Sequence, residues 1–551
     1  MTENELKDQT LKALTMGRTS VTGSLQLFLG KIASTVIMAI STIILGWFIL
    51  EGDYGLYVVA LIPATTLLLF QDWGISSALI RSCARCRASN NNGDLKKIII
   101  AGLTFEITTG LILTLVSVLT ATFIATTIFA KPESALLIIF ASVTILSTSV
   151  SSAAQSIFIG FERMKLNSIV MVCQAVVQSV TAPLLVYLGY GAFGAVIGFT
   201  LASIASSIIS LTLMYLELFR KLPSRIGNYN IIQTLKPLLH YGIPLAIGTI
   251  IAGISTQIYS LMMASWVVDN ALIGNYRIAL NFAVLLAFFS LPISTVLFPA
   301  FSKIDPKSEL KLLRMVFTSS VKYTALLLVP AALAMTVLAQ PLIGTLYGTK
   351  WVQASTFLAI SVIGNILFIF GNMSVSSLFS AVGETKLIMK LNLLSLFVGV
   401  PIAFVLIPPL GIVGVILGSL VAGIPSMFVG LYFAWKRYGA KVDFQVNLRI
   451  LLSSALAATA SYLFLGVFNS TDWIRLTFAT SIFLIVFLIT APIIGAISQT
   501  DIINFRLMSS GLGVISKILE IPLMIEEKII HSYPKCQTER QKNKLSFSSN
   551  T

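Results

Sequence analysis

Long apolar runs with almost no charge decide what this chain can fold into. Residues 20–50 contain one charged side chain, Lys31, residues 98–130 contain only Glu106, and residues 169–187 contain none. Stretches of about 20 apolar residues are long enough to cross a bilayer as a helix. Only 11% of the chain is charged, against roughly 25% in soluble domains. The sequence therefore predicts an all-α integral membrane protein with many spans.

The apolar runs predict about fourteen transmembrane helices. Their expected ranges are 20–49, 55–80, 98–129, 134–159, 167–188, 192–218, 241–267, 273–301, 319–341, 354–380, 387–407, 411–435, 449–468 and 474–497.

The basic residues are distributed unevenly between the two sides of these spans. Of the 37 Lys and Arg residues, 32 fall in the two termini and the loops of one side, four fall on the other side, and Lys31 lies within the first span. Cytoplasmic loops are enriched in Lys and Arg, so we expect both termini in the cytoplasm and the chain in the plasma membrane. The net charge of +15 then faces anionic lipid, and no nucleic-acid partner is expected.

Small-residue patterns recur at a nearly constant offset. Residues 191–198 read GAFGAVIG and residues 411–418 read GIVGVILG, 220 positions later. Gly55 and Gly274, each within a Tyr-containing motif, are 219 apart, and Glu162 and Glu384 are 222 apart. A chance recurrence is the alternative, because Gly is common in membrane helices. Three agreeing offsets favour a duplication of six spans in parallel orientation, which is typical of secondary transporters with a substrate site between the halves.

The repeat sets the expected organisation of the chain. Two six-helix lobes are followed by two additional spans and a cytoplasmic tail that combines an amphipathic part with a basic part. The expected ranges are 1–19 for the cytoplasmic N-terminus, 20–238 and 239–440 for the lobes, 441–500 for the added spans and 501–551 for the tail.

Three stretches resemble a known family. These are EGDYGLYVVALIP…LFQDWGISSALIR (51–81), GFERMKLNSI (160–169) and the segment from YGIPLAIGTI to LPISTVLFPAFSK (241–303). They resemble polysaccharide and lipid-linked oligosaccharide flippases of the Wzx type, in the MOP superfamily with lipid II flippases and MATE exporters. The resemblance implies a two-lobed bundle that works by alternating access. It also implies a polyprenyl phosphate- or pyrophosphate-linked glycan as substrate and glycosyltransferases of the same pathway as partners.

Few charged groups lie inside the predicted spans, and these are the candidates for binding and coupling. A charge at mid-bilayer costs about 2.5–3.5 kcal/mol on insertion scales, so it should face water or a partner. Lys31 is a candidate phosphate contact, and its alternatives are a structural pair with Asp72 or Glu106 or snorkelling to the interface. Asp72 and Glu106 are candidates for ion coupling, or simply for pairing with cations such as Arg81.

Polar side chains add further candidates for substrate binding. Arg277 and Asn281 share a face near the outer end of the eighth span, where Arg277 is alternatively an interfacial anchor. Gln174 and Gln178 share a face of the fifth span and offer hydrogen bonds to sugar hydroxyls, or they join helices. Prolines at 63, 244, 292 and 299 are candidate bends. The candidate substrate-binding set is therefore Lys31, Arg81, Gln174, Gln178, Arg277 and Asn281, and the candidate ion-coupling pair is Asp72 and Glu106.

No enzyme motif is present in the sequence. H-E-x-x-H, G-x-S-x-G and a phosphate-binding loop of the G-x-x-x-x-G-K-[ST] type are all missing. Cys83 and Cys86 make at most half of a zinc site. We therefore expect no enzyme activity, no metal and no cofactor. A flippase for lipid-linked oligosaccharide is the favoured function, and a MATE-like, cation-coupled exporter of small organic molecules is the alternative.

Overall fold

The structure, a computed structural model, describes residues 3–89, 91–222, 230–282, 297, 301–509 and 514–532. Within these ranges every regular element is a helix, and eleven helical stretches are long and apolar enough to cross a membrane. The prediction of an all-α, multi-pass membrane protein is therefore confirmed. The expected count of fourteen spans is not established, since much of the eighth predicted span lies outside the described residues.

By their contacts the described helices form two compact units. Unit 1 comprises residues 1–277 and 403–415, and unit 2 comprises residues 278–402 and 416–551. The borders of these units are defined by contacts between residues. The two predicted lobes are defined by the sequence repeat, and they stay a prediction.

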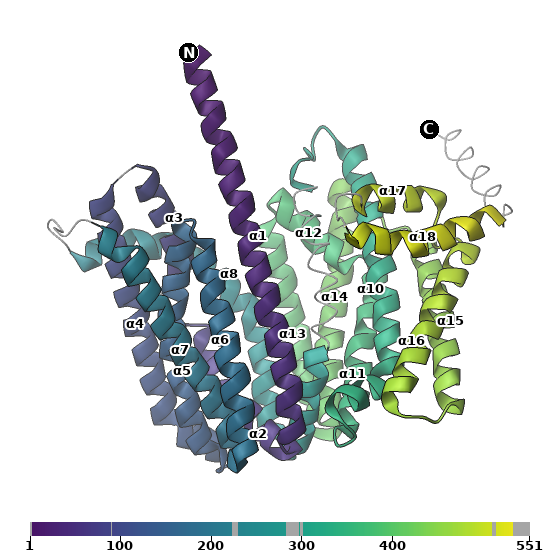
Figure 1. The fold of residues 1–551 in the computed structure, drawn as a ribbon, viewed down its shortest axis with the longest axis horizontal. Coiled ribbons are helices and arrows are strands. Elements are labelled where there is room, and N and C mark those ends of the chain that lie inside the picture. Colours follow the sequence, from purple (N-terminus) through teal and green to yellow (C-terminus); the bar gives the residue numbers. More distant parts are fainter. Residues whose placement is uncertain are drawn as a thin grey trace. The chain divides into compact units, whose positions relative to one another are not determined.

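Unit 1 is built mainly from the first eight long helices of the chain (Figure 1). α5 packs on α4, α7, α2 and α3, and α1 packs along α6. A core of large apolar side chains, among them Leu79, Ile99 and Phe158, joins α3, α4 and α5. The helices of unit 1 are α1 (Glu3–Phe48), α2 (Glu51–Leu68), α3 (Ile75–Ala88), α4 (Asn92–Phe123), α5 (Ser134–Gly160), α6 (Met164–Leu185), α7 (Gly191–Glu217) and α8 (Ile231–Trp266), with short turns η1 (Ile124–Ile128), η2 (Val186–Tyr190) and η3 (Phe219–Lys221).

Unit 2 is centred on α10, which packs on α11, α15 and α16. The amphipathic part of the predicted tail forms α17 and α18, which lie across the ends of α10, α15 and α16 in Figure 1. Ile502 and Leu523 bury apolar side chains against this end, and Asp501 pairs with Lys322 of α10. The helices are α10 (Leu310–Tyr347), α11 (Val352–Ile363), η4 (Gly364–Phe370), α12 (Asn372–Val382), α13 (Thr385–Leu410), α14 (Ile412–Tyr438), α15 (Phe444–Val467), α16 (Asp472–Ile494), α17 (Gln499–Ser509) and α18 (Val514–Ser532). By their contacts, residues 403–415 of α13 and α14 belong to unit 1.

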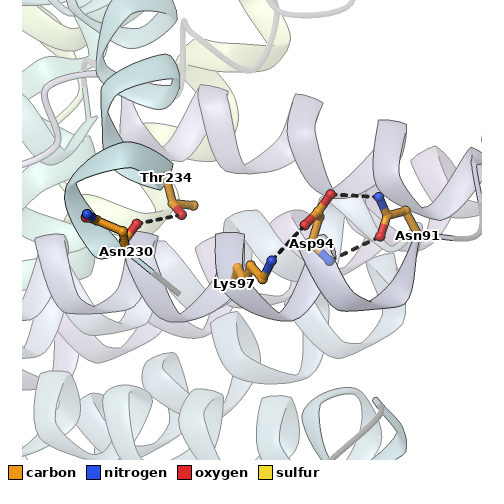
Figure 2. Close-up of polar contacts among 5 residues, drawn as sticks. All are labelled: Asn91, Asp94, Lys97, Asn230 and Thr234. Atoms are coloured by element: carbon orange, nitrogen blue, oxygen red, sulfur yellow. Dashed lines mark hydrogen bonds and ion pairs between the residues drawn. The ribbon is translucent and has the colours of Figure 1, made fainter. Parts of the chain in front are cut away.

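Asparagine residues cap the first helical turns of α4 and α8 (Figure 2). Asn91 accepts a hydrogen bond from the Asp94 amide at 3.2 Å, and Asp94 in turn pairs with Lys97 at 3.3 Å. Asn230 accepts bonds from the first amides of α8 and from Thr234 Oγ1. Such caps satisfy donors that a helix start leaves free. The two helices therefore begin at polar residues just outside their apolar runs.

The repeated glycine patterns bring α7 and α14 against the helices that precede them. A Cβ at Gly198 would lie 2.4 Å from Cα of Ala182 in α6, and one at Gly414 would lie 2.3 Å from the carbonyl oxygen of Leu406 in α13. Only glycine permits backbones this close. The patterns thus serve packing between neighbouring helices.

Two predicted spans are broken in the structure. The span expected at 55–80 ends as α2 and resumes as α3, and the span expected at 354–380 is divided into α11, η4 and α12. In neither case is a proline the cause: Pro63 and Pro244 lie inside continuous helices. Pro292 and Pro299 lie outside the described residues. The breaks instead fall at Gly74 and Gly371, whose φ angles are 78° and 82°, a conformation that glycine adopts at little cost.

Candidate transport site

The break between α2 and α3 is the most distinctive backbone feature near the predicted coupling residues. Trp73 and Gly74 have φ angles of 46° and 78°. A Cβ at Gly74 would lie 2.1 Å from the carbonyl oxygen of Gly242 in α8, far inside van der Waals contact. The break is therefore held backbone to backbone against α8, and glycine is required on both sides of the contact.

A buried carboxyl group lies beside this break. Glu106, in the middle of α4, has no exposed surface. Its Oε2 accepts a hydrogen bond from Gln71 Nε2 at 2.7 Å, and its Oε1 has no partner. Asp72 follows Gln71 and accepts a bond from the amide of Ser76 at 2.7 Å, which caps α3. The two candidate coupling residues are thus brought to one place, with Gln71 as a connecting residue that the sequence analysis did not single out.

Arg81 is not a partner of Asp72 in the structure. Its guanidinium carbon lies 4.3 Å from the centre of the Tyr241 ring in α8, a cation–π contact. Arg81 is otherwise exposed. It therefore forms a second link between α3 and α8 and keeps donors available for a ligand.

Lys31 lies on the exposed flank of α1. The face of α1 that contacts α6 contains Gly30, whose Cβ would lie 2.4 Å from that of Ser168, and Ile37, whose carbonyl accepts a bond from Ser179 Oγ at 3.3 Å. The Lys31 side chain is exposed. An ion pair of Lys31 with Asp72 or Glu106 was the alternative to a phosphate contact. Among the described residues Lys31 forms no ion pair, and the two carboxyl groups accept hydrogen bonds from Ser76 and Gln71 instead.

Gln174 and Gln178 line the same helix pair as Lys31. Along α6 both residues fall between Ser168 and Ser179, whose hydroxyls donate hydrogen bonds to backbone carbonyls of α1. Gln174 is half-buried, and Gln178 is buried with 8% of its surface exposed. Gln174 is thus better placed than Gln178 to meet a ligand alongside α1.

Arg277 and Asn281 lie on a helix that covers residues 270–282. Arg277 is exposed. Asn281 is half-buried. Both stay candidate contacts for a substrate head group.

A reciprocal contact joins the two repeated glycine motifs, and the sequence analysis did not foresee it. A Cβ at Gly55 would lie 1.8 Å from the carbonyl oxygen of Asn270, and one at Gly274 would lie 2.4 Å from that of Glu51. The offset of 219 that relates Gly55 to Gly274 also relates Glu51 to Asn270. The two motifs thus exchange equivalent partners, which is the pattern that a two-fold relation would give.

Polar bonds reinforce this contact. Asn275 Nδ2 donates to Glu51 Oε2 at 2.6 Å, and the buried Lys131 Nζ donates to the carbonyl of Val267, at the end of α8, at 2.9 Å. Burial lowers the pKa of Lys131 to about 8, against the opposing pull of Glu133 and Asp269. The contact holds the start of α2 against the residues that follow α8. The charge distribution predicts that these ends of the two helices face the outer side of the membrane.

Two family models match this chain. The model of polysaccharide biosynthesis proteins matches residues 20–305, just over half of the chain. The chain belongs to this family. The model of the lipid II flippase MurJ matches residues 165–486. Both groups are membrane proteins of transport and flipping rather than enzymes, as predicted.

Individual proteins agree with this assignment. The lipopolysaccharide biosynthesis protein WzxC of Escherichia coli K12 is 27% identical over 209 residues, which is 38% of this chain and 42% of WzxC. The match thus spans less than half of that relative.

Solved structures share the fold. The lipid II flippase MurJ, in an inward closed conformation, aligns with a TM-score of 0.68 at 16% identity over 85% of this chain and 98% of MurJ. An inward-facing MATE multidrug transporter of the MOP superfamily aligns with a TM-score of 0.59 at 17% identity over 73% of this chain and 94% of its own. The resemblance to this superfamily is therefore confirmed for the fold.

The arrangement suits binding and conformational change. The described residues hold no group of three His, Cys, Asp or Glu side chains placed to bind a metal ion. They do include an exposed cation in a membrane-spanning helix, Lys31, and a buried carboxyl group, Glu106. Close contacts at glycine residues, such as Gly55 and Gly274, bring neighbouring segments together. These features are consistent with the transporters of the families that match this chain.

Proposed function

We propose that this protein is a flippase that moves a lipid-linked oligosaccharide from the cytoplasmic to the outer leaflet, for surface polysaccharide or glycoprotein assembly. The carrier is a polyprenyl phosphate or pyrophosphate, and glycosyltransferases of the same pathway supply the substrate. The observation that carries the proposal is Lys31, an exposed cation in the first membrane-spanning helix of a chain whose first half matches the polysaccharide biosynthesis family.

The chemistry of such a substrate fits the candidate residues. A phosphate group needs cations in a membrane-embedded site, where charge-assisted hydrogen bonds are strong. Lys31 and Arg81 both offer donors, and Gln174 lies along the same helix pair as Lys31. The glycan needs hydrogen bonds, and the isoprenoid tail can stay in the bilayer throughout.

The orientation follows from the basic residues and has a direct test. We propose a plasma-membrane location with both termini in the cytoplasm. Ser470 lies in the exposed turn between α15 and α16, within the sequence Asn469-Ser470-Thr471. In a variant without the four native cysteines, a Ser470→Cys substitution should react with a membrane-impermeant maleimide added to intact cells. If the cysteine introduced at position 470 is labelled only after the cytoplasmic face is made accessible, the orientation of the chain is the opposite of the one proposed.

The proposed function is tested in a strain that lacks the protein. We expect lipid-linked glycan to accumulate on the cytoplasmic leaflet, where it resists impermeant reagents, and surface glycan to disappear. Restoring the wild-type chain should restore both. Normal surface glycan together with increased sensitivity to small organic cations would instead favour the MATE-like exporter.

A further inference from the structure

We propose that α17 and α18 form a pH-sensitive cap on unit 2, with the buried carboxyl group of Glu526 as its sensor. α18 is docked while this group carries a proton and is released when the group loses it. The cap belongs to unit 2 alone, and its behaviour does not depend on the proposed function.

α17 is fastened to α10 by polar contacts. Asp501 Oδ2 pairs with Lys322 and accepts two hydrogen bonds from Ser498, from its amide at 2.7 Å and from its hydroxyl at 2.5 Å. Asn504 Nδ2 donates a hydrogen bond to the hydroxyl of Tyr323 at 2.9 Å. One carboxylate oxygen of Asp501 thus has a cation and two donors around it, and α17 has a defined position on α10.

α18 is held by apolar packing and by one arginine. It packs against α16 and α17, and Leu523 is buried in the same apolar cluster as Ile502 of α17. Arg506 of α17 pairs with Glu527 at 2.7 Å and with Glu520 at 3.6 Å. All three of these charged side chains are partly exposed, and ion pairs of this kind contribute little. Docking of α18 therefore depends mainly on its buried face.

Glu526 lies on the buried face of α18. Only 5% of its surface is exposed, and among the described residues it has no hydrogen-bond or ion-pair partner. A buried carboxylate without a cation or donors is strongly disfavoured. The Glu526 side chain is therefore neutral while α18 is docked, and its ionisation requires that the side chain reach water.

The charge of Asp501 adds to this effect. Asp501 acts on Glu526 by repulsion, and Lys322, which could offset a second negative charge, is already paired with Asp501. Burial first, and Asp501 second, raise the pKa of Glu526 from 4.5 to about 7. The group therefore changes its charge near neutral pH.

The other helices at this end contribute few further groups. α16 carries two charged residues, Asp472 and Arg475. Asp472 lies 19 residues before Ala491 of the apolar cluster, roughly 28 Å along the helix. The remaining titratable residues are Arg506 of α17, Lys311, Arg314, Lys322, Tyr323 and Tyr347 of α10, Arg449 and Tyr462 of α15, and Lys517, Glu520, Glu527, Lys528 and His531 of α18.

The direction of the pH effect follows from the two states of α18. A released Glu526 is in water and has its ordinary pKa, so the docked form binds the proton more tightly. Docking is therefore strongest at low pH, weakens as the pH rises from 4.5 to about 7, and changes no further above that range. The whole range corresponds to about 300-fold in the docking equilibrium, and a rise from about pH 6 to about pH 7.5 corresponds to roughly tenfold.

The cap connects helices that are otherwise joined only along their lengths. α17 and α18 lie across the ends of α10, α15 and α16 (Figure 1), so a docked cap restrains movement of these ends and a released cap does not. The tail is predicted to lie in the cytoplasm. Acidification of the cytoplasm is then the condition that tightens the cap.

Hydrogen–deuterium exchange, read by peptide mass spectrometry, tests the cap without any transport. The protection of residues 514–532 in the purified protein is corrected for the intrinsic dependence of exchange on pH. It should fall roughly tenfold between about pH 6 and about pH 7.5. Protection of α15, in the same unit, should not change and is the internal reference. Constant protection of α18 over this range would overturn the proposal.

Variants of α18 identify the sensor. Glu526→Gln cannot titrate and should stay protected at both pH values. Glu526→Leu suits the apolar surroundings and should do the same, which covers the case that a buried amide fails to dock. Two controls should respond as the wild type does: Glu520→Gln, which changes an exposed carboxylate of the same helix, and His531→Asn, which removes a side chain that commonly titrates near this pH.

The outcomes separate the sensor from a structural residue. The inference is wrong if either Glu526 variant docks and still responds to pH, or if the response is lost in His531→Asn. It is also wrong if both Glu526 variants leave α18 unprotected at every pH, because Glu526 is then needed for packing and not for sensing.

Discussion

Gly55→Val is expected to abolish flipping, because its Cβ would fall 1.8 Å from the carbonyl oxygen of Asn270. Overpacking of this kind costs about 1–3 kcal/mol, which corresponds to a shift of about 5- to 150-fold between two conformations. The penalty applies only while the reciprocal glycine contact is closed. We therefore expect a folded protein that cannot complete its cycle. With a fluorescent polyprenyl diphosphate-linked sugar as the probe, this is measured as loss of probe movement between the leaflets of proteoliposomes, with little change in melting temperature.

Matched variants make this prediction specific. Gly274→Val should reproduce the defect, because Gly274 meets Glu51 as Gly55 meets Asn270. Gly52→Val lies on the same helix as Gly55, but nothing lies within 4 Å of its Cβ position. It should therefore move the probe normally. Equal activity of Gly52→Val and Gly55→Val would show that the contact does not take part in transport.

The sequence predicted the membrane class correctly because that class depends on apolar runs along the chain. The duplication also depends on a pattern along the chain, and it stays a prediction. Apolar runs indicate which segments are long enough to cross a bilayer. The glycine offsets indicate which residues of the two predicted repeats correspond to each other. The same offsets contained the reciprocal contact, since Gly55 and Gly274 were already paired. The sequence analysis did not foresee that these two motifs contact each other.

The helix breaks were not predicted, for a physical reason. Hydropathy does not distinguish one straight span from two shorter helices, and prolines were the expected cause of bends. Pro63 stays inside a helix because one missing backbone bond does not end it. Gly74 ends one because a left-handed residue turns the chain and allows Gly242 to approach. That approach comes from a helix more than 150 residues away in sequence, and no local pattern records it.

The candidate site, too, could be predicted from the sequence only in part. Charge in an apolar run identified Asp72, Glu106 and Lys31 directly. The partners of these residues were out of reach, because Gln71 is an ordinary polar residue until the fold brings it to Glu106. Arg81 was one of the cations considered as a partner of Asp72, whereas its contact is the Tyr241 ring.

Lys31→Ala is expected to abolish surface glycan assembly while the protein stays in the membrane. A charge-assisted hydrogen bond to phosphate is worth about 1.5–3 kcal/mol, so binding of a polyprenyl diphosphate probe should weaken by about one to two orders of magnitude. The substitution should not harm the fold, because Lys31 is exposed and the close contact of α1 with α6 is made by Gly30 against Ser168.

Two further variants separate charge from packing at this position. Lys31→Arg keeps the positive charge and should keep most of the activity, whereas Lys31→Met keeps the length of the side chain and should behave like Lys31→Ala. Lys221→Ala removes an exposed lysine that pairs with Glu217 near the end of α7, and it should assemble surface glycan normally. If Lys31→Met assembles glycan as well as the wild type does, Lys31 is an interfacial anchor and the phosphate contact must be sought among the other exposed cations, beginning with Arg81 and Arg277.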